Sequence, residues 1–214
     1  MKTLLLDVGG VVIRHAFELR RRAETVFGLP TGSLDRGGPF GPTPDPDWEL
    51  VEAGKLVEHD YWETWTADIG RRAGRPDLTI RELWQVLYGG GEAEFIRPET
   101  MALARDVVAA GSPVAMLSND LTAFHGREWV DGVSAFRHLG PLLDAASLGA
   151  RKPDPAAYAA ATTRLGVPPS AVVFTDDLED NIRGAEAAGL SAVYFEITDP
   201  AGSVARVRAA LNRL

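Results

Sequence analysis

Four short polar clusters in this sequence hold side chains that could do chemistry together. They are Asp7-Val8-Gly9-Gly10, Ser118-Asn119-Asp120, Arg151-Lys152-Pro153-Asp154 and Asp176-Asp177-Leu178-Glu179-Asp180-Asn181. Together they offer several carboxylates, a lysine ammonium group, a hydroxyl group and a glycine turn. Any one of them alone could be a turn or a helix cap, because Asp, Asn and Ser favour both positions. Four such clusters in one chain favour a shared functional site instead.

The carboxylates of this set predict a bound metal ion. Adjacent carboxylates repel one another, so keeping Asp7 ionised near Asp176 and Asp177 calls for a cation. Oxygen ligands without histidine or cysteine favour Mg²⁺. A divalent ion beside Lys152 would attract a phosphate dianion, and an aspartate nucleophile can then accept the phosphoryl group as an acyl phosphate.

Strands and helices alternate along the part of the chain that positions these clusters. Apolar runs predict strands, and stretches that end at Gly111, Gly166 and Gly189 predict helices. The expected strands are 3–6, 113–117, 171–174 and 191–195, and the expected helices are 98–110, 155–165, 179–188 and 200–211. This alternation predicts a three-layer α/β fold with a Rossmann-like parallel sheet. The carboxyl ends of parallel strands share one edge, so the clusters after residues 6, 117 and 174 should converge there.

A helical block interrupts this alternation after the first strand. Helical spacing covers residues 17–27, 48–73 and 79–88, whereas the Gly- and Pro-rich segment 30–47 predicts a loop. We therefore predict a small helical cap at residues 15–90, inserted into a core domain made of residues 1–14 and 91–214. Four tryptophans should form most of the apolar centre of the cap, and one of them could line a substrate pocket: Trp48, Trp62, Trp65 and Trp84.

Composition excludes several functional classes. The 214 residues carry a net charge of −8 and no basic stripe, which argues against nucleic acid as a partner. The chain has no cysteine, so disulfides and thiolate chemistry are ruled out. No apolar stretch approaches the length of a membrane span, and Asp7 interrupts the N-terminal leucines too early for a signal peptide. We expect a soluble cytoplasmic protein, a monomer or homodimer, that acts on a small molecule.

Taken in order, the clusters identify a family resemblance. The relevant segments are Leu6-Asp7-Val8-Gly9-Gly10-Val11, Leu117-Ser118-Asn119, Arg151-Lys152-Pro153-Asp154-Pro155, and Val173-Phe174-Thr175-Asp176-Asp177 with Asn181. Over nearly its whole length the chain resembles the haloacid dehalogenase-like (HAD) hydrolase superfamily. The insert resembles the helical, C1-type cap class, and the closest similarity is to small sugar-phosphatase-like members.

The resemblance implies a role for each matching residue in a phosphatase. Asp7 would be the nucleophile and a Mg²⁺ ligand, and Gly9 would offer its backbone carbonyl to the metal. Ser118 would hydrogen-bond the phosphoryl oxygens with help from the Asn119 backbone. Lys152 would neutralise Asp7 and the phosphate. The substrate would be a small phosphorylated metabolite.

In the fourth motif, the resemblance places Asp177 at the position of the family's metal-binding acid. Asn181 stands where a second acid is usual, and Asp176 would be an outer or alternate ligand. The helix expected after this motif turns Asp180 away from the site if Asn181 faces it.

One position departs from the pattern of many phosphatases in this family. They carry a general acid–base aspartate two residues after the nucleophile, and here that position is Gly9. Loss of a positioned general acid costs about 10²- to 10⁴-fold in rate. The chain could therefore be a slow phosphatase, or one whose substrate has a good leaving group. It could also recruit an acid from the cap, for which the candidates are Glu49, Glu52, Glu58 and His59.

Two further alternatives stay open. A 2-haloacid dehalogenase needs no proton for its halide, although the Asp176-Asp177 pair suits a metal that dehalogenases lack. A phosphate-binding regulator could have lost turnover together with its general acid. Arg14 and His15 could touch substrate where the chain enters the cap, and Lys55 could in principle form a Schiff base.

Overall fold

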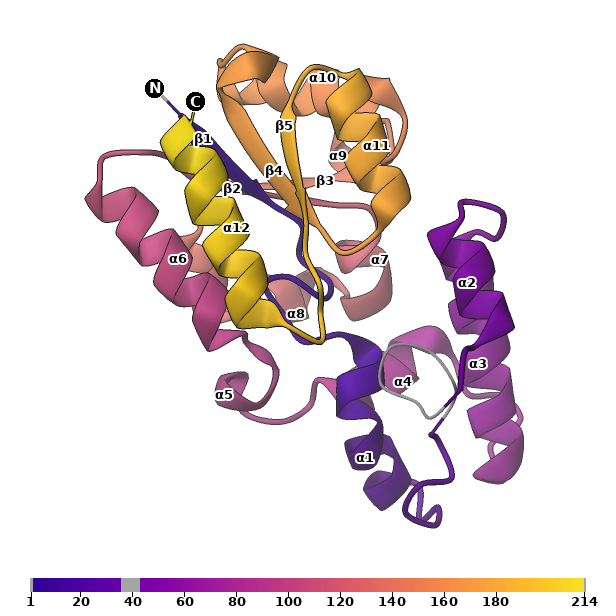
Figure 1. Cartoon of the computed structure of the whole chain (residues 1–214). Coiled ribbons are helices and arrows are strands. Elements are labelled where there is room, and N and C mark those ends of the chain that lie inside the picture. The colour runs from indigo at the N-terminus through magenta and orange to yellow at the C-terminus, as the bar shows by residue number, and fades with distance from the viewer. Residues whose placement is uncertain (1, 36–42, 214) are drawn as a thin grey trace. The chain divides into compact units, whose positions relative to one another are not determined.

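The computed structural model describes residues 2–35 and 43–213, and it divides the chain into two compact units (Figure 1). The first unit contains Met1–Arg14 and Ile96–Leu214, and the second contains His15–Phe95. The predicted insert ends at residue 90, whereas the second compact unit extends to Phe95. The reason is helix α5 (Glu92–Phe95), whose Phe95 ring packs against Tyr88 of the second unit with centroids 5.9 Å apart.

A parallel sheet of five strands forms the centre of the first unit. Its strands are β1 (Thr3–Leu6), β2 (Val114–Ser118), β3 (Leu142–Asp144), β4 (Val172–Asp176) and β5 (Ser191–Tyr194). Their order in the sheet is β3-β2-β1-β4-β5, and every pairing is parallel. The predicted Rossmann-like α/β fold is therefore confirmed. The short edge strand β3 is an addition to the four strands expected from the sequence.

Helices cover both faces of this sheet. On one face α10 (Pro155–Leu165) and α11 (Glu179–Ala187) share an apolar cluster with Leu5 and Phe174. On the other face α6 (Pro98–Ala109) contacts β2, and α12 (Pro200–Arg213) contacts β4, β5 and α6. The first unit is completed by α7 (Leu121–His125), α8 (Arg127–Gly132), α9 (Ala145–Leu148) and the 3₁₀ turns Ser134–His138 and Pro169–Ala171.

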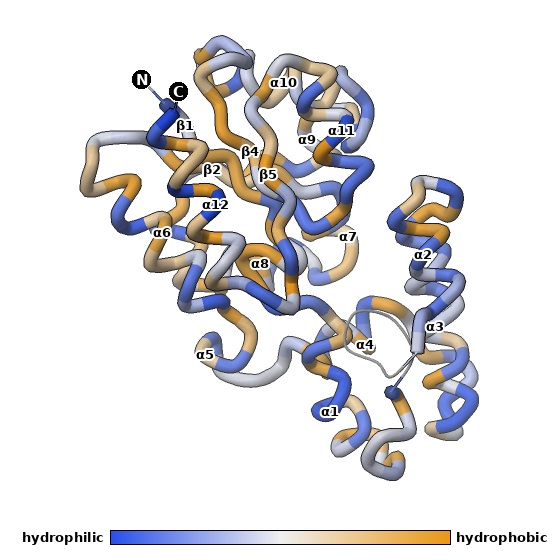
Figure 2. The backbone as a smooth tube through the Cα atoms, viewed as in Figure 1, coloured by the Kyte–Doolittle hydropathy of each residue, from blue (hydrophilic) through white to orange (hydrophobic). Residues whose placement is uncertain are grey.

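Burial on both faces explains why the central strands are almost wholly apolar. Leu4, Leu5 and Leu6 of β1 have no exposed surface, although successive side chains of a strand point to opposite faces. Uninterrupted apolar runs of this kind are typical of parallel strands covered by helices on both sides. Figure 2 shows the same hydrophobic character in β1, β2 and β4.

Within the described residues of the second unit there are five helices. Before α5 come α1 (Ala16–Val26), α2 (Pro46–Glu52), α3 (Glu58–Arg72) and α4 (Ile80–Leu87). The stretch 48–73, expected to be helical throughout, is divided by a turn at residues 53–57. Gly54 lies in that turn with φ +67°, a conformation that favours glycine. Of the loop expected at 30–47, residues 36–42 lie outside the described part of the chain.

Aromatic side chains fill the interior of the second unit. Trp48, Trp62, Trp65 and Trp84 are each at most 4% exposed. The Trp62 ring lies with its centroid 5.4 Å from Trp65 and 5.1 Å from Trp84, both in edge-to-face geometry. These distances are in the favourable range for aromatic pairs. The four tryptophans therefore form core, as expected.

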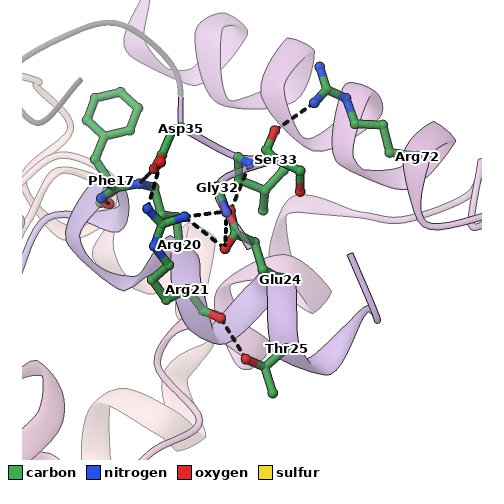
Figure 3. Close-up of polar contacts among 10 residues, drawn as sticks. Phe17, Arg20, Arg21, Glu24, Thr25, Gly32, Ser33, Asp35 and Arg72 are labelled. Carbon is green, nitrogen blue, oxygen red and sulfur yellow. Dashed lines mark hydrogen bonds and ion pairs between the residues drawn. The ribbon is translucent and has the colours of Figure 1, made fainter. Parts of the chain in front are cut away.

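The turn after α1 is held by a buried carboxylate (Figure 3). Glu24 accepts hydrogen bonds from the backbone amides of Leu34 at 2.8 Å and Gly32 at 3.1 Å. Arg21 donates to both Glu24 oxygens, at 2.9 and 3.0 Å, and to Asp35 at 2.6 Å. These contacts fix residues 32–35 against α1.

Candidate active site

The carboxyl ends of three neighbouring strands bring the first, second and fourth clusters to one edge of the sheet. Leu6 of β1 is in register with Met116 of β2 and Thr175 of β4. The amide of Asp7 continues this pairing by donating to the Thr175 carbonyl at 2.9 Å. Asp7, Ser118 and Asp176 therefore end or follow adjacent strands at the same level.

Three carboxylates gather at this edge. Asp7, Asp176 and Asp177 each offer an oxygen atom, and these atoms lie within 4.8 Å of one another. Asp7 and Asp176 are buried, whereas Asp177 is partly exposed. Such a group is costly without positive charge nearby.

Lys152 supplies part of that charge. Its side chain is only 2% exposed, and its ammonium group donates to Asp7 Oδ1 and, at 2.6 Å, to Asp176 Oδ2. Burial lowers the pKa of Lys152, but the carboxylates of Asp176 and Asp7 outweigh burial, and the net shift is upward. The ammonium group therefore stays protonated.

The pKa of Asp7 moves in the opposite sense to that of an ordinary ion-paired aspartate. Burial is the largest cause and raises it, the charge of Asp176 raises it further, and Lys152 lowers it. The result is a pKa of about 7 in the metal-free protein. A cation at this position would favour the ionised, nucleophilic form.

The two carboxylates of the fourth cluster differ in their surroundings. Asp176 Oδ1 accepts from the Leu178 amide and from Asn181 Nδ2, both at 2.9 Å.

Asp177 instead lies against Gly10, where an added Cβ atom would come 2.0 Å from Asp177 Oδ2. Gly10 has φ +72°, so glycine is required there both by conformation and by space. Asp180 pairs with Arg183 at 3.2 Å, away from Asn181, which is buried.

The second and third clusters are joined by a pair of hydrogen bonds. Asn119 Nδ2 donates to the Lys152 carbonyl at 2.9 Å, and the Lys152 amide donates to Asn119 Oδ1 at 2.8 Å. Sequence reasoning assigned only the backbone of Asn119 and missed this use of its side chain.

Ser118 is buried, and its Oγ accepts from the Leu121 amide at 3.2 Å. Arg151 and Asp120 form an ion pair between the same two loops.

Gly9 is exposed, and its φ lies outside the left-handed region that Gly10 occupies. An added Cβ atom at Gly9 would have Asp7 Oδ2, 4.0 Å away, as its nearest neighbour. The backbone therefore has room for a side chain at the position where many phosphatases of the resembling family carry their general acid.

Three of the four candidate acids of the insert, Glu52, Glu58 and His59, have partners within the second unit. Trp48 Nε1 donates to Glu52 at 3.1 Å, and Trp62 Nε1 donates to Glu58 at 2.9 Å. His59 lies 3.3 Å from Glu63. His15 caps α1 by accepting from the Phe17 amide, so its position has a structural reason independent of substrate.

The donor set fits a magnesium ion. The three carboxylates supply hard oxygen ligands from one small volume, as Mg²⁺ requires. Asp7, Asp176 and Asp177 could each offer an oxygen to it, and both oxygens of Asp176 also accept hydrogen bonds within the protein.

Comparison with known proteins identifies the family. Residues 1–189 match the model for haloacid dehalogenase-like hydrolases, so the chain belongs to this hydrolase family. Over 99 residues it is 30% identical to phosphatase MT3486 of Mycobacterium tuberculosis, covering 46% of each chain. Over 125 residues it is 28% identical to phosphoserine phosphatase of Thermus thermophilus, covering 58% of this chain and 50% of that enzyme. The chain thus spans about half the length of these curated relatives.

Solved structures share the fold at low identity. YfnB of Bacillus subtilis, bound to magnesium, superposes with a TM-score of 0.66 at 15% identity, covering 91% of this chain and 86% of that one. The L-2-haloacid dehalogenase RSc1362 gives a TM-score of 0.58 at 20% identity, with the same coverage. At these identities the likeness supports the fold alone.

Proposed function

We propose that this protein is a Mg²⁺-dependent phosphomonoester hydrolase that acts on a small phosphorylated metabolite through an aspartyl-phosphate. The observation that supports this proposal most strongly is the buried Lys152 ammonium group, which donates to Asp7 and Asp176 beside the carboxylate of Asp177. A nucleophilic carboxylate, a fixed cation and a carboxylate metal site are the components that phosphoryl transfer to aspartate needs. We further propose that residues 15–95 act as the cap and that the enzyme works in the cytoplasm as a monomer or homodimer.

The proposed reaction has two displacements at phosphorus. An oxygen of Asp7 attacks the phosphorus atom, the bond to the ester oxygen breaks, and the leaving oxygen takes a proton. Water then attacks the acyl phosphate, which releases inorganic phosphate and restores the Asp7 carboxylate. Bound Mg²⁺, held by Asp7, Asp177 and the Gly9 carbonyl, would supply charge stabilisation for the phosphoryl oxygens.

Protein side chains orient the phosphoryl group in this scheme. Lys152 balances the negative charge that gathers on Asp7 and the phosphate, and Asn119 holds the Lys152 backbone in place. Ser118 and the Asn119 amide donate to the phosphoryl oxygens. Ser118 ends β2 and the Asn119 side chain is bonded to the Lys152 backbone, so the fold positions these donors before substrate binds.

A dehalogenase is the second candidate, and the observation that favours it is Gly9. Halide leaves without a proton, so a site that lacks an acid at this position suits it. The carboxylates of Asp7, Asp176 and Asp177 argue against a dehalogenase, because three carboxylates with oxygens within 4.8 Å of one another call for a cation.

One assay separates the candidates. The full chain, freed of metal, is given nitrophenyl phosphate or L-2-chloropropionate with and without Mg²⁺, and phosphate or chloride release is measured. We expect phosphate release that a chelator abolishes and added Mg²⁺ restores. Chloride release insensitive to chelator would establish the dehalogenase. Binding of phosphate without any turnover would indicate a regulator.

A further inference from the structure

We propose that Arg97 is a positioning residue for the candidate metal site, because it fixes the loop after Asp7 against the segment that carries Asp177. The inference rests on the proposed function, since it concerns the same Mg²⁺ site. Arg97 precedes α6 and is only 1% exposed, although its guanidinium group is permanently charged. A buried charge of this kind needs hydrogen-bonding partners, and the position of those partners indicates its role.

The first set of contacts lies on the loop that follows Asp7. Arg97 Nε donates to the Gly10 carbonyl at 2.6 Å, and the Arg97 amide donates to the Val12 carbonyl at 2.9 Å. Between them, Thr100 Oγ1 donates to the Val11 carbonyl at 2.7 Å. Three consecutive carbonyl groups of the loop are thus bonded to residues 97 and 100, which lie far away in sequence. Together these bonds fix the course of the loop.

Gly10 connects this set of contacts to the metal site. Its carbonyl is held by Arg97, while its Cα lies so close to Asp177 that a Cβ would reach 2.0 Å from the carboxylate oxygen. A rotation of the Gly10 peptide would therefore change the space available to Asp177. Arg97 controls that rotation through its bond to the carbonyl oxygen.

The guanidinium group also contacts the other side of the site. It lies over the Phe195 ring, 5.8 Å from the centroid, and the Phe195 amide donates to the Asp176 carbonyl at 2.8 Å. Arg97 therefore contacts both the loop after β1 and the segment after β5 that is bonded to the end of β4. This double contact distinguishes a positioning role from simple packing.

The test compares Arg97→Met with two control variants of the full chain. Leu103→Ala removes a buried side chain from α6, the helix that follows Arg97, and destabilises the fold without removing any of the hydrogen bonds to the loop carbonyls. Arg208→Met makes the same chemical change at a surface ion pair with Asp106.

Mn²⁺ binding is titrated by electron paramagnetic resonance below the unfolding temperature of each variant. Amide hydrogen exchange of Val12 and Ile13, both bonded to the Val8 carbonyl, is measured without metal.

We expect Arg97→Met to weaken Mn²⁺ binding by about 10- to 100-fold, as losses of outer-shell partners do. Exchange at Val12 and Ile13 should accelerate in the metal-free variant by more than the change in global stability explains. Both control variants should bind Mn²⁺ like the wild type. If Arg97→Met fails to fold, Arg97→Lys decides the question, because it keeps the buried cation but not the guanidinium geometry.

Two results would overturn the inference, and they are distinguishable. Wild-type Mn²⁺ affinity and wild-type exchange in a folded Arg97 variant would show that the residue only packs. Absence of both Mn²⁺ binding and phosphate release in the wild type would instead overturn the proposed function, and the inference with it.

Discussion

Lys152 Nζ lies 2.6 Å from Asp176 Oδ2, and this bond gives the two adjacent aspartates of the fourth cluster different surroundings. The other oxygen of Asp176 accepts from Leu178 and Asn181. Both oxygens are thus engaged within the protein. Asp177 lies against Gly10, at the loop that follows Asp7, and we propose it as the metal ligand of the pair.

Asp177→Ala should weaken Mg²⁺ binding and abolish turnover. The matched control is Asp180→Ala, which removes an aspartate of the same cluster that pairs with Arg183 on the helix surface. Surface ion pairs of this kind contribute about 0–1 kcal/mol to stability, so the control should fold and work nearly normally. The Mg²⁺ dependence of phosphate release measures both. A metal-bound structure with Asp180 coordinated and Asp177 free would contradict this assignment.

Asp7→Asn should reduce phosphate release to background. The amide keeps the size of the carboxylate but lacks the charge that attacks phosphorus. Steady-state hydrolysis of nitrophenyl phosphate measures the loss, and thermal unfolding shows that the fold is intact. Substantial activity in this variant would rule out an aspartyl-phosphate.

Gly9→Asp should raise the hydrolysis of alkyl phosphates more than that of nitrophenyl phosphate. An alkoxide needs a proton on leaving, whereas nitrophenolate does not. The backbone permits the change, because the nearest atom to a Cβ at this position is 4.0 Å away. The measurement is the ratio of the two rates in variant and wild type. An unchanged ratio in the folded variant would mean that the acid comes from elsewhere or that protonation does not limit the rate.

The raised pKa of Asp7 predicts a pH-dependent metal affinity. A pKa of about 7 against an ordinary 3.8 means that the proton competes with the cation up to neutral pH. Apparent Mn²⁺ affinity should therefore rise by up to about tenfold per pH unit below pH 7 and level off above it. The folding stability of the metal-free protein depends on pH in the opposite direction. The stability contributed by protonated Asp7 is present at acidic pH and is lost as the pH rises through 7. Asp7→Asn should lack this part of the pH dependence.

Glu24→Gln should destabilise the second unit at pH 7 by about 1–3 kcal/mol, because charge-assisted bonds to buried donors are lost. Burial raises the pKa of Glu24, but the bonds from Leu34, Arg21 and Gly32 outweigh burial, and the net shift is downward. A lowered pKa contributes stability above the ordinary value of 4.5 and loses it as the pH falls through the folded-state pKa. Urea unfolding at several pH values measures the difference, which should shrink in acid. A difference that stays constant with pH would contradict the role of the charge.

Much of the core was predictable because its strands are buried on both faces. Thr3–Leu6 and Val172–Asp176 are apolar runs that end at acids, and parallel strands bring such ends together whatever the details of packing. β3 was missed because Leu142–Asp144 is a three-residue edge strand with no comparable apolar run. The break at 53–57 was missed because the flanking segments keep helical spacing.

The contacts that position the site were harder to predict. In the sequence, Arg97 is an ordinary residue before the proline that begins α6. Only the tertiary fold brings its side chain to the Gly10 carbonyl. The side chain of Asn119 meets the Lys152 backbone across a long sequence separation. Periodicity describes which face of an element is buried, but it does not specify which distant carbonyl a buried donor reaches.

The antiparallel bridge between Ile13 and Ile96 has a consequence for the evolution of the protein. The two residues face each other like the last pair of a β-hairpin, and everything between them leaves and rejoins the sheet domain at one place. A short turn, or any module whose ends meet, could replace residues 14–95 without interrupting a strand of the sheet. Under the proposed function, exchange of this whole module would change what surrounds the substrate and leave the sheet edge that carries Asp7 and Asp176 unchanged.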